Sequence, residues 1–336
     1  FALLDLVIVL IIASALGYLL RYRMQRPPVG RFNRSDVVIM SCLLAVLPFG
    51  YLAMPPLVVS GVFAVMFLGI GHMTLSPVVG GRLALAAGAV IVAATATAGF
   101  LDNAPTVLAL NCVVILVALV GVTNLWTQTG MSAAHVVGLS TVLIGYDLIA
   151  TGFTSVTDRF LDQVNGLPFA PLLAVTTGSV PVAAGLGDCL MLTLWPLVAT
   201  KAYGRAAGAW GVIVGMGLLV AVQSTFVTGA VDSGVPFMII LGPAIIVQHL
   251  IWRKLRGAER RTGEWSGATH STPDTTERGS QLSQGLVAVR GIATTLPGTW
   301  VAVHAGEIVG EGPTPGSARR AARQGGCTEV PVIVMV

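Results

Sequence analysis

Two aspartates stand inside apolar runs of the sequence, where an ionisable side chain is unusual. One is Asp188, which ends the stretch Gly185-Leu186-Gly187-Asp188. The other is Asp147, which follows Tyr146 in the preceding apolar run. A charged side chain at membrane depth costs roughly 2.5–3.5 kcal/mol on insertion scales, so such a residue is taken as functional by default. The two aspartates therefore point to acid/base chemistry.

Two carboxylates in a low-dielectric site do not both ionise easily, so they share a proton and titrate as a pair. One then acts as general base on a water molecule while the other donates a proton to a carbonyl oxygen. Water must reach such a pair, and Gly185 and Gly187 remove side chains beside Asp188. The alternative for each aspartate alone is a buried residue that a neighbouring Ser, Thr or Tyr satisfies by a hydrogen bond.

The composition predicts an integral membrane protein. Of the 336 residues, 54% are hydrophobic and 10% are charged, with a mean hydropathy of +0.84, whereas about 25% of residues are charged in soluble domains. The basic residues behind the net charge of +4 lie in loops and in the tail, as topology requires, so we expect no nucleic-acid partner. The four cysteines show no paired spacing, so we expect neither a disulfide framework nor a metal site, and no cofactor.

A spanning helix needs about 20 mainly apolar residues, and nine stretches meet this requirement. The predicted spans are 2–20, 37–53, 56–72, 81–101, 105–126, 132–155, 181–200, 206–229 and 235–252. The first span, 2–20, is too long for the apolar core of a signal peptide, so we expect it to remain as a membrane-anchored helix. Most Lys and Arg fall in loops on one side, which predicts an N-terminus outside and a C-terminus in the cytoplasm. The Ala-, Gly- and Val-rich usage points to a prokaryotic cell membrane.

Composition also divides the chain into an all-α transmembrane domain (1–252), a flexible polar linker (253–284) and a small α+β module (285–336). The elements predicted for the module are strands at 300–303, 307–309 and 330–334, a helix at 317–324, and a further ordered stretch at 286–292. Arg319, Arg320 and Arg323 form either a solvated helix face or a patch for a protein partner.

The predicted spans place three features at one depth. Asp147 lies about eight residues below the outer end of its span and Asp188 about seven, so at 1.5 Å per residue both lie about 11–12 Å deep. Pro243, about seven residues below the start of the last span, is expected at the same depth. A proline leaves carbonyl groups without donors, which is tolerated where the break lines a cavity or is buried in protein. A kink without function is the alternative. Gly211 and Gly215 have the small-xxx-small spacing that permits close helix packing.

These motifs together resemble the presenilin and signal peptide peptidase family of intramembrane aspartyl proteases. The family pattern is Tyr-Asp on the sixth helix, Gly-x-Gly-Asp on the seventh and Pro-Ala-Leu on the ninth. The chain has Tyr146-Asp147, Gly185-Leu186-Gly187-Asp188 and Pro243-Ala244-Ile245. Ile245 replaces the family's leucine, which keeps the volume and adds β-branching. The resemblance covers about residues 1–252, and the expected orientation is similar to that of the signal peptide peptidase branch.

The resemblance implies an endopeptidase in the lipid bilayer that cuts transmembrane or signal-peptide-like segments. It implies that Asp147 and Asp188 are the catalytic pair. It assigns site-shaping to Tyr146, Gly185, Leu186 and Gly187, and substrate positioning to Pro243, Ala244 and Ile245. An unwound substrate needs partners for its backbone groups, and adding a strand to a sheet edge supplies them. We expect loop 156–180, or its junction with the next span, to provide that edge.

Three other functions fit the same residues. An ion-coupled transporter also uses intramembrane acidic residues and broken helices, although no inverted repeat is visible here. A prepilin-peptidase-like enzyme also has Gly-x-Gly-Asp, but it acts at the cytoplasmic face and has fewer spans. The third is a catalytically silent membrane scaffold whose C-terminal module binds a partner.

Overall fold

The structure is a computed structural model that describes residues 1–24, 34–176, 182–229, 235–260, 265, 299–304, 307–327 and 331–335. The chain divides into two compact units, Phe1–Trp265 and Ser266–Val336. Each unit is described by itself.

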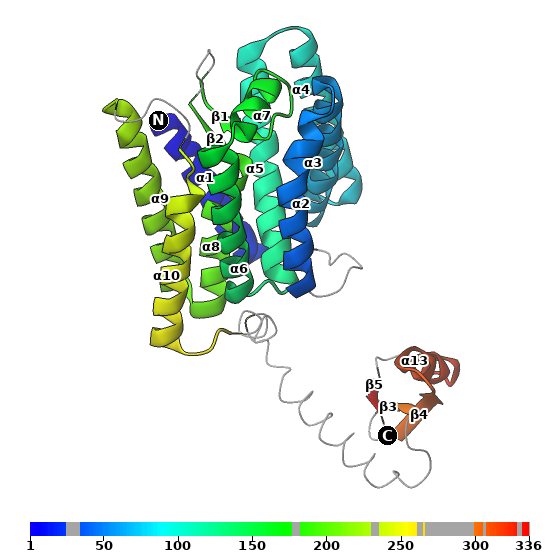
Figure 1. Ribbon diagram of the computed structural model, residues 1–336. Coiled ribbons are helices and arrows are strands. Elements are labelled where there is room, and N and C mark those ends of the chain that lie inside the picture. Colours follow the sequence, from blue (N-terminus) through cyan, green and yellow to red (C-terminus); the bar gives the residue numbers. More distant parts are fainter. Residues whose placement is uncertain are drawn as a thin grey trace. The chain divides into compact units, whose positions relative to one another are not determined.

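The first unit is a bundle of helices (Figure 1). In chain order these are α1 (Ala2–Arg21), α2 (Arg34–Leu52), α3 (Pro56–Val79), α4 (Gly81–Phe100), α5 (Ala104–Thr129), α6 (Ala133–Asp147), α7 (Val156–Val164), α8 (Leu186–Tyr203), α9 (Arg205–Val227) and α10 (Met238–Arg256). A π-helical segment, η1 (Leu148–Phe153), continues α6. Strands β1 (Leu172–Ala174) and β2 (Ala183–Gly185) pair antiparallel. They lie with α7 at the end of the bundle where α1 begins, which we call the hairpin end.

Among the described residues of this unit, seven helices are long and apolar enough to cross a membrane, and they indicate an integral membrane protein. They are α1, α3, α4, α5, α6 with η1, α9 and α10. Helices α2 and α8 lie where spans were predicted but are not among the seven, so the nine predicted spans are not confirmed. Helix α8 is enclosed by protein, with residues 191–203 all buried. A helix in that position needs no apolar face toward lipid and can carry Asp188 and Lys201.

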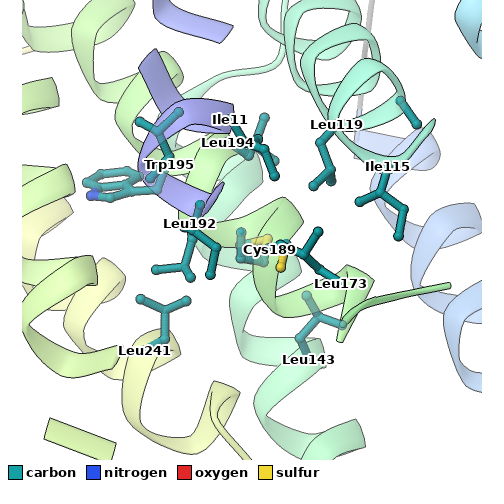
Figure 2. Close-up of a cluster of buried hydrophobic side chains, with 14 of the residues drawn as sticks. Ile11, Ile115, Leu119, Leu143, Leu173, Cys189, Leu192, Leu194, Trp195 and Leu241 are labelled. Atoms are coloured by element: carbon teal, nitrogen blue, oxygen red, sulfur yellow. The ribbon is translucent and has the colours of Figure 1, made fainter. Parts of the chain in front are cut away.

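Helix α8 forms the centre of the core. Figure 2 shows side chains of other elements around Cys189, Leu192 and Trp195 of this helix. They include Ile11 of α1, Ile115 and Leu119 of α5, Leu143 of α6, Leu173 of β1 and Leu241 of α10.

Helix α9 approaches α8 through glycines. A Cβ atom at Gly211 would lie 3.1 Å from the Trp195 ring, and one at Gly215 would lie 2.9 Å from Leu192. A Cβ atom at Gly208 would collide with the hydroxyl of Thr200. The close packing predicted for Gly211 and Gly215 is therefore confirmed, with Gly208 as a third member.

Several helix boundaries follow directly from local sequence. Helix α3 begins at Pro56 after Pro55, which confirms the predicted break between the second and third spans. Helix α5 ends at Thr129, and the following Gly130 has a φ of 114°, in the left-handed region that favours glycine. Ser132 caps α6, because its side chain accepts the N–H of His135 while the His135 side chain accepts the N–H of Ser132.

The prediction of a flexible linker from residue 253 is wrong for its first residues. Helix α10 continues to Arg256, and residues 257–260 pack on the bundle. Arg260 donates its backbone N–H to the carbonyl of Ala202 (3.1 Å), and its Nη2 donates to the carbonyl of Thr200 (3.0 Å). Glu259 accepts the N–H of Ala133 at 2.7 Å. These partners exist because helix ends leave backbone groups without intrahelical bonds. Most of the remaining predicted linker lies outside the described residues.

The second unit contains the module predicted from the sequence. Strands β3 (Trp300–His304), β4 (Glu307–Gly312) and β5 (Val332–Met335) form an antiparallel sheet in the order β4-β3-β5, and helix α13 (Pro315–Gln324) follows β4. Ala302 of β3 packs against Ala318 and Ala322 of α13. The predicted strands and helix are confirmed, and the stretch 286–292 lies outside the described residues. The three arginines of α13 are exposed.

Candidate functional site

Asp147 is the last residue of α6, where the helix changes into the π-helical segment η1. Its Oδ1 accepts the hydroxyl of Thr151 at 2.9 Å. Its Oδ2 accepts the backbone N–H of Met238, the first residue of α10, also at 2.9 Å. The Thr151 hydroxyl lies 2.9 Å from that of Thr157 in α7. Short π-helical segments occur frequently at functional sites, and here the segment begins at the carboxylate. Asp147 is thus fixed from both η1 and α10.

Asp188 is the third residue of α8, because the helix begins at Leu186. The predicted start of this span at residue 181 is wrong, since Ala183–Gly185 is strand β2. Short apolar runs adopt either conformation, and here pairing with β1 decides. In the first turn of a helix, backbone N–H groups without intrahelical partners favour a carboxylate. Asp188 is therefore at a helix start, and not seven residues inside a helix as the depth calculation assumed.

The two glycines before Asp188 leave space around its carboxyl group. A Cβ atom at Gly185 would lie 3.2 Å from Oδ2 of Asp188. A Cβ atom at Gly187 would meet nothing within 4 Å. Neither glycine has a positive φ within the described residues, so the lack of a side chain, and not a special backbone conformation, distinguishes these positions.

The structure brings Asp147 and Asp188 together. Helix α6 packs against α8, and Asp147 lies close enough to Asp188 to act on its carboxyl group electrostatically. Leu143, one turn before Asp147, lies in the same core cluster as Cys189, which follows Asp188, and Leu173 of β1 (Figure 2). No direct hydrogen bond joins the two aspartates in the part of the chain that the structure describes. Both side chains are half-buried. Asp188 lies in the first turn of α8, and Asp147 lies where α6 continues into η1.

Strand β1 is the inner strand of the hairpin. Its Leu172 and Leu173 are buried. Helix α5 holds the segment, because Asn111 Nδ2 donates to the carbonyl of Ala170 (2.9 Å) and the Cys112 thiol to that of Ala174 (3.2 Å). Ala183 and Gly185 of β2, in contrast, are exposed.

Strand β2 has an open edge. The N–H of Val175 bonds to the carbonyl of Val182 (3.0 Å), and the N–H of Leu186 to that of Pro171 (3.2 Å). Hydrogen-bonded pairs alternate with non-bonded pairs along an antiparallel ladder, so Ala183 and Gly185 direct their N–H groups away from β1. Among the described residues, β1 is the only strand beside β2. The junction of the loop with α8 therefore contains an edge strand, as expected.

The Pro243-Ala244-Ile245 stretch does not lie where the depth calculation placed it. The hydrogen bond of Asp147 is to Met238, so Pro243 lies five residues further along α10, about 7.5 Å away. The equal depth is wrong because the first residue of α10 meets the carboxylate. Pro243 is exposed and Ala244 half-buried, whereas Ile245 is fully buried. Ile245 is part of the hydrophobic core.

The remaining predicted residues adjoin the pair without bonding to it. Tyr146 and Leu186 are half-buried next to the site. Within the described ranges, the Tyr146 hydroxyl has no hydrogen-bond partner, and Leu186 packs against the core.

Sequence reasoning missed the two groups that hold Asp147. Thr151 carried a signal, because a residue four positions after Asp147 lies on the same helix face. The N–H of Met238 carried none, since a backbone group has no sequence signature. Among the described residues there is no group of three or more His, Cys, Asp or Glu side chains that is suited to a metal ion.

No family model, no curated protein and no solved structure matches this chain. A function for it has to be argued from the geometry of the two aspartates and the hairpin.

Proposed function

We propose that the protein is an intramembrane aspartyl protease that hydrolyses peptide bonds within transmembrane segments. The observation that carries this proposal is the approach of Asp147 and Asp188 at the hairpin end, beside the open edge of β2. We also propose that this end faces the outside of a prokaryotic cell and that the C-terminus is cytoplasmic, because most loop Lys and Arg fall on the other side.

The partners of each carboxylate favour a division of roles. Asp147 accepts one hydrogen bond on each oxygen, from Thr151 and from Met238, and such bonds favour a carboxylate in its charged form. Asp188 has no hydrogen bond of this kind within the described residues. We assign Asp147 as the general base and Asp188 as the carrier of the shared proton.

In this mechanism, Asp147 removes a proton from water as the water oxygen attacks the scissile carbonyl carbon. Asp188 donates its proton to the carbonyl oxygen, which gives a neutral gem-diol. The gem-diol collapses as its hydroxyl returns a proton to Asp188 and Asp147 gives its proton to the leaving nitrogen. Both carboxyl groups then have their starting protonation states. Gly187 directly precedes Asp188, and the open space where its side chain would be supports access of the water molecule to the carboxylates.

The β2 edge supports a mode of substrate binding. A transmembrane helix satisfies its backbone internally, so unwinding it exposes several polar groups in a medium without water. The outward N–H groups of Ala183 and Gly185 offer partners to an extended segment. Gly185 is three residues from Asp188, so a segment paired there lies next to the carboxylates.

The test is cleavage of a labelled transmembrane peptide by purified full-length protein in liposomes. We expect Asp147→Asn and Asp188→Asn each to lower the rate by about 10²–10⁴-fold, as for loss of a general acid or base. Asp158→Asn, which changes an aspartate of α7, is the matched control and should leave cleavage unchanged.

Persistent cleavage in both variants would rule out the proposed dyad. Proton-coupled flux without cleavage would favour a transporter. The position of the cut bond separates the proposal from a prepilin-peptidase-like enzyme, because we expect the cut in the half of the segment nearer the hairpin end.

A further inference from the structure

A cavity of about 340 Å³ lies at the opposite end of α8 from Asp188. Its walls are the turn between α8 and α9 and the segment that follows α10. Three arginines line it: Arg205, Arg256 and Arg260. The other lining residues are small, apart from Tyr203. No part of the proposed proteolytic mechanism uses this cavity.

The three arginines come from separate segments and converge on one space. Arg205 is the first residue of α9 and Arg256 the last residue of α10. Arg260 is held in place, because its Nη2 donates to the carbonyl of Thr200 near the end of α8. That nitrogen lies 3.9 Å from where a Cβ atom of Gly204 would be. The φ of 106° at Gly204 favours glycine there, which keeps the turn open beside the guanidinium.

No ion pair joins these arginines to a carboxylate within the described ranges, although Glu259 lies close enough to act on Tyr203 of the same cavity. The nearest acidic residue in sequence is Glu259, whose carboxylate accepts the N–H of Ala133 at the start of α6. A cluster of three guanidinium groups therefore favours an anion between them.

We propose that this cavity binds a phosphate group, supplied either by the headgroup of an anionic lipid or by a soluble phosphate. The planar guanidinium fork matches phosphate oxygens in a bidentate manner. The cavity volume corresponds to roughly ten water molecules, which is enough for a phosphate and part of the glycerol of a lipid. Its place at the ends of α9 and α10, two helices able to span a membrane, is where lipid headgroups lie.

The test uses the full-length protein in neutral detergent and native mass spectrometry with added phosphatidylglycerol or phosphatidylcholine. The variant is Arg205→Gln/Arg256→Gln, which removes two charges and leaves the hydrogen bond of Arg260 to Thr200 intact. The control is Arg82→Gln/Lys254→Gln, which removes two exposed charges that do not line the cavity. A parallel arm measures protection by inorganic phosphate against thermal unfolding.

We expect one phosphatidylglycerol to bind more tightly than phosphatidylcholine. Each arginine near a headgroup contributes about fivefold in affinity, so the double variant should bind about 25-fold more weakly. The control should change by less than about twofold. The variant Arg205→Lys/Arg256→Lys keeps both charges and loses the bidentate forks, so its affinity should lie between that of the wild type and that of the glutamine variant. It guards against a loss caused by misfolding.

Arginine-dependent protection by inorganic phosphate without lipid selectivity would assign the site to a soluble phosphate. Equal losses of phosphatidylglycerol affinity in the arginine variant and the control would show only a general effect of surface charge and would overturn the proposal. The proposal would also be overturned if the wild-type protein neither preferred phosphatidylglycerol nor was protected by inorganic phosphate. Neither outcome depends on peptide cleavage, so this test stands apart from that of the protease.

Discussion

The substitution Gly185→Pro tests substrate pairing at the β2 edge, because it removes one outward N–H group and leaves the native hairpin unchanged. Gly185 has φ −62° and ψ 146°, values that proline adopts without strain. Its N–H belongs to a non-bonded pair of the ladder and points away from β1. Proline therefore removes a donor that no described group of the protein uses. The control is Gly185→Ala, which adds the same Cβ atom, 3.2 Å from Oδ2 of Asp188, and keeps the donor.

The expected effect is the loss of one backbone hydrogen bond to the substrate. Such a bond contributes about 0.5–1.5 kcal/mol net. We expect kcat/KM of Gly185→Pro to be about fivefold below that of Gly185→Ala, within about 2–13-fold. Thermal unfolding of the two variants should differ little, because the native hairpin keeps all its bonds and proline restricts the unfolded chain.

The assay is cleavage of a labelled transmembrane peptide in liposomes, with kcat/KM from initial rates. Equal values for the two variants would refute strand addition at β2 while leaving the catalytic pair untouched. A clearly lower melting temperature for Gly185→Pro alone would show that the Gly185 N–H has a partner within the protein. The pairing register of β1 and β2 would then differ from the one described here.

Three other substitutions probe the supports of the site. Thr151→Val removes the hydroxyl that bonds to Asp147 and should lower kcat about tenfold, whereas Thr151→Ser should restore it; unchanged kcat in Thr151→Val would show that this bond does not orient the base. Glu259→Ala should cost about 1 kcal/mol in thermal unfolding, as for a lost helix cap, and Glu259→Gln, which keeps an acceptor, should cost less; equal melting curves would contradict this capping role. Gly208→Ala should destabilise by about 1–3 kcal/mol because its Cβ atom meets Thr200, whereas Gly217→Ala meets nothing and should be neutral; similar stabilities of the two would exclude close packing at Gly208.

The helices of the bundle were largely predictable because their signal is local. Apolar runs of sufficient length mark α1, α4, α5 and α9 to within three residues. Pro56 marks the start of α3, but this helix continues to Val79, seven residues past its predicted end. Helix α10 shows the limit of this approach. Arg253, Lys254 and Arg256 look like the start of a polar tail, but basic residues are favourable in the last turn of a helix, and they belong to α10.

The residues of the hairpin were not predicted, although a sheet edge was expected in loop 156–180 or at its junction with the next span. Residues 183–185 continue an apolar run, and no local feature separates a short strand from a helix start. Their conformation depends on Leu172, Leu173 and Ala174, which lie about ten residues earlier in the chain and are held by α5. Non-local pairing of this kind leaves little trace in a single sequence. The meeting of Asp147 and Asp188 was predicted from their equal depth and from the motifs, but the depth calculation assumed that Asp188 lay well inside a helix, whereas it lies in the first turn of α8.

The arrangement of the hairpin also bears on the substrates that the proposed protease would accept. Strand β2 and Asp188 belong to one continuous stretch, and the bond from Leu186 to the carbonyl of Pro171 fixes their relative position. A strand added to β2 lies about 4.8 Å from it, and it meets only Ala183, Ala184 and Gly185, which have no side chains large enough to form pockets. Recognition would therefore depend on main-chain hydrogen bonds, which do not distinguish side chains. Selection would fall instead on how readily a transmembrane helix unwinds, so a glycine or proline near the cut bond should accelerate cleavage more than any change of apolar side chain.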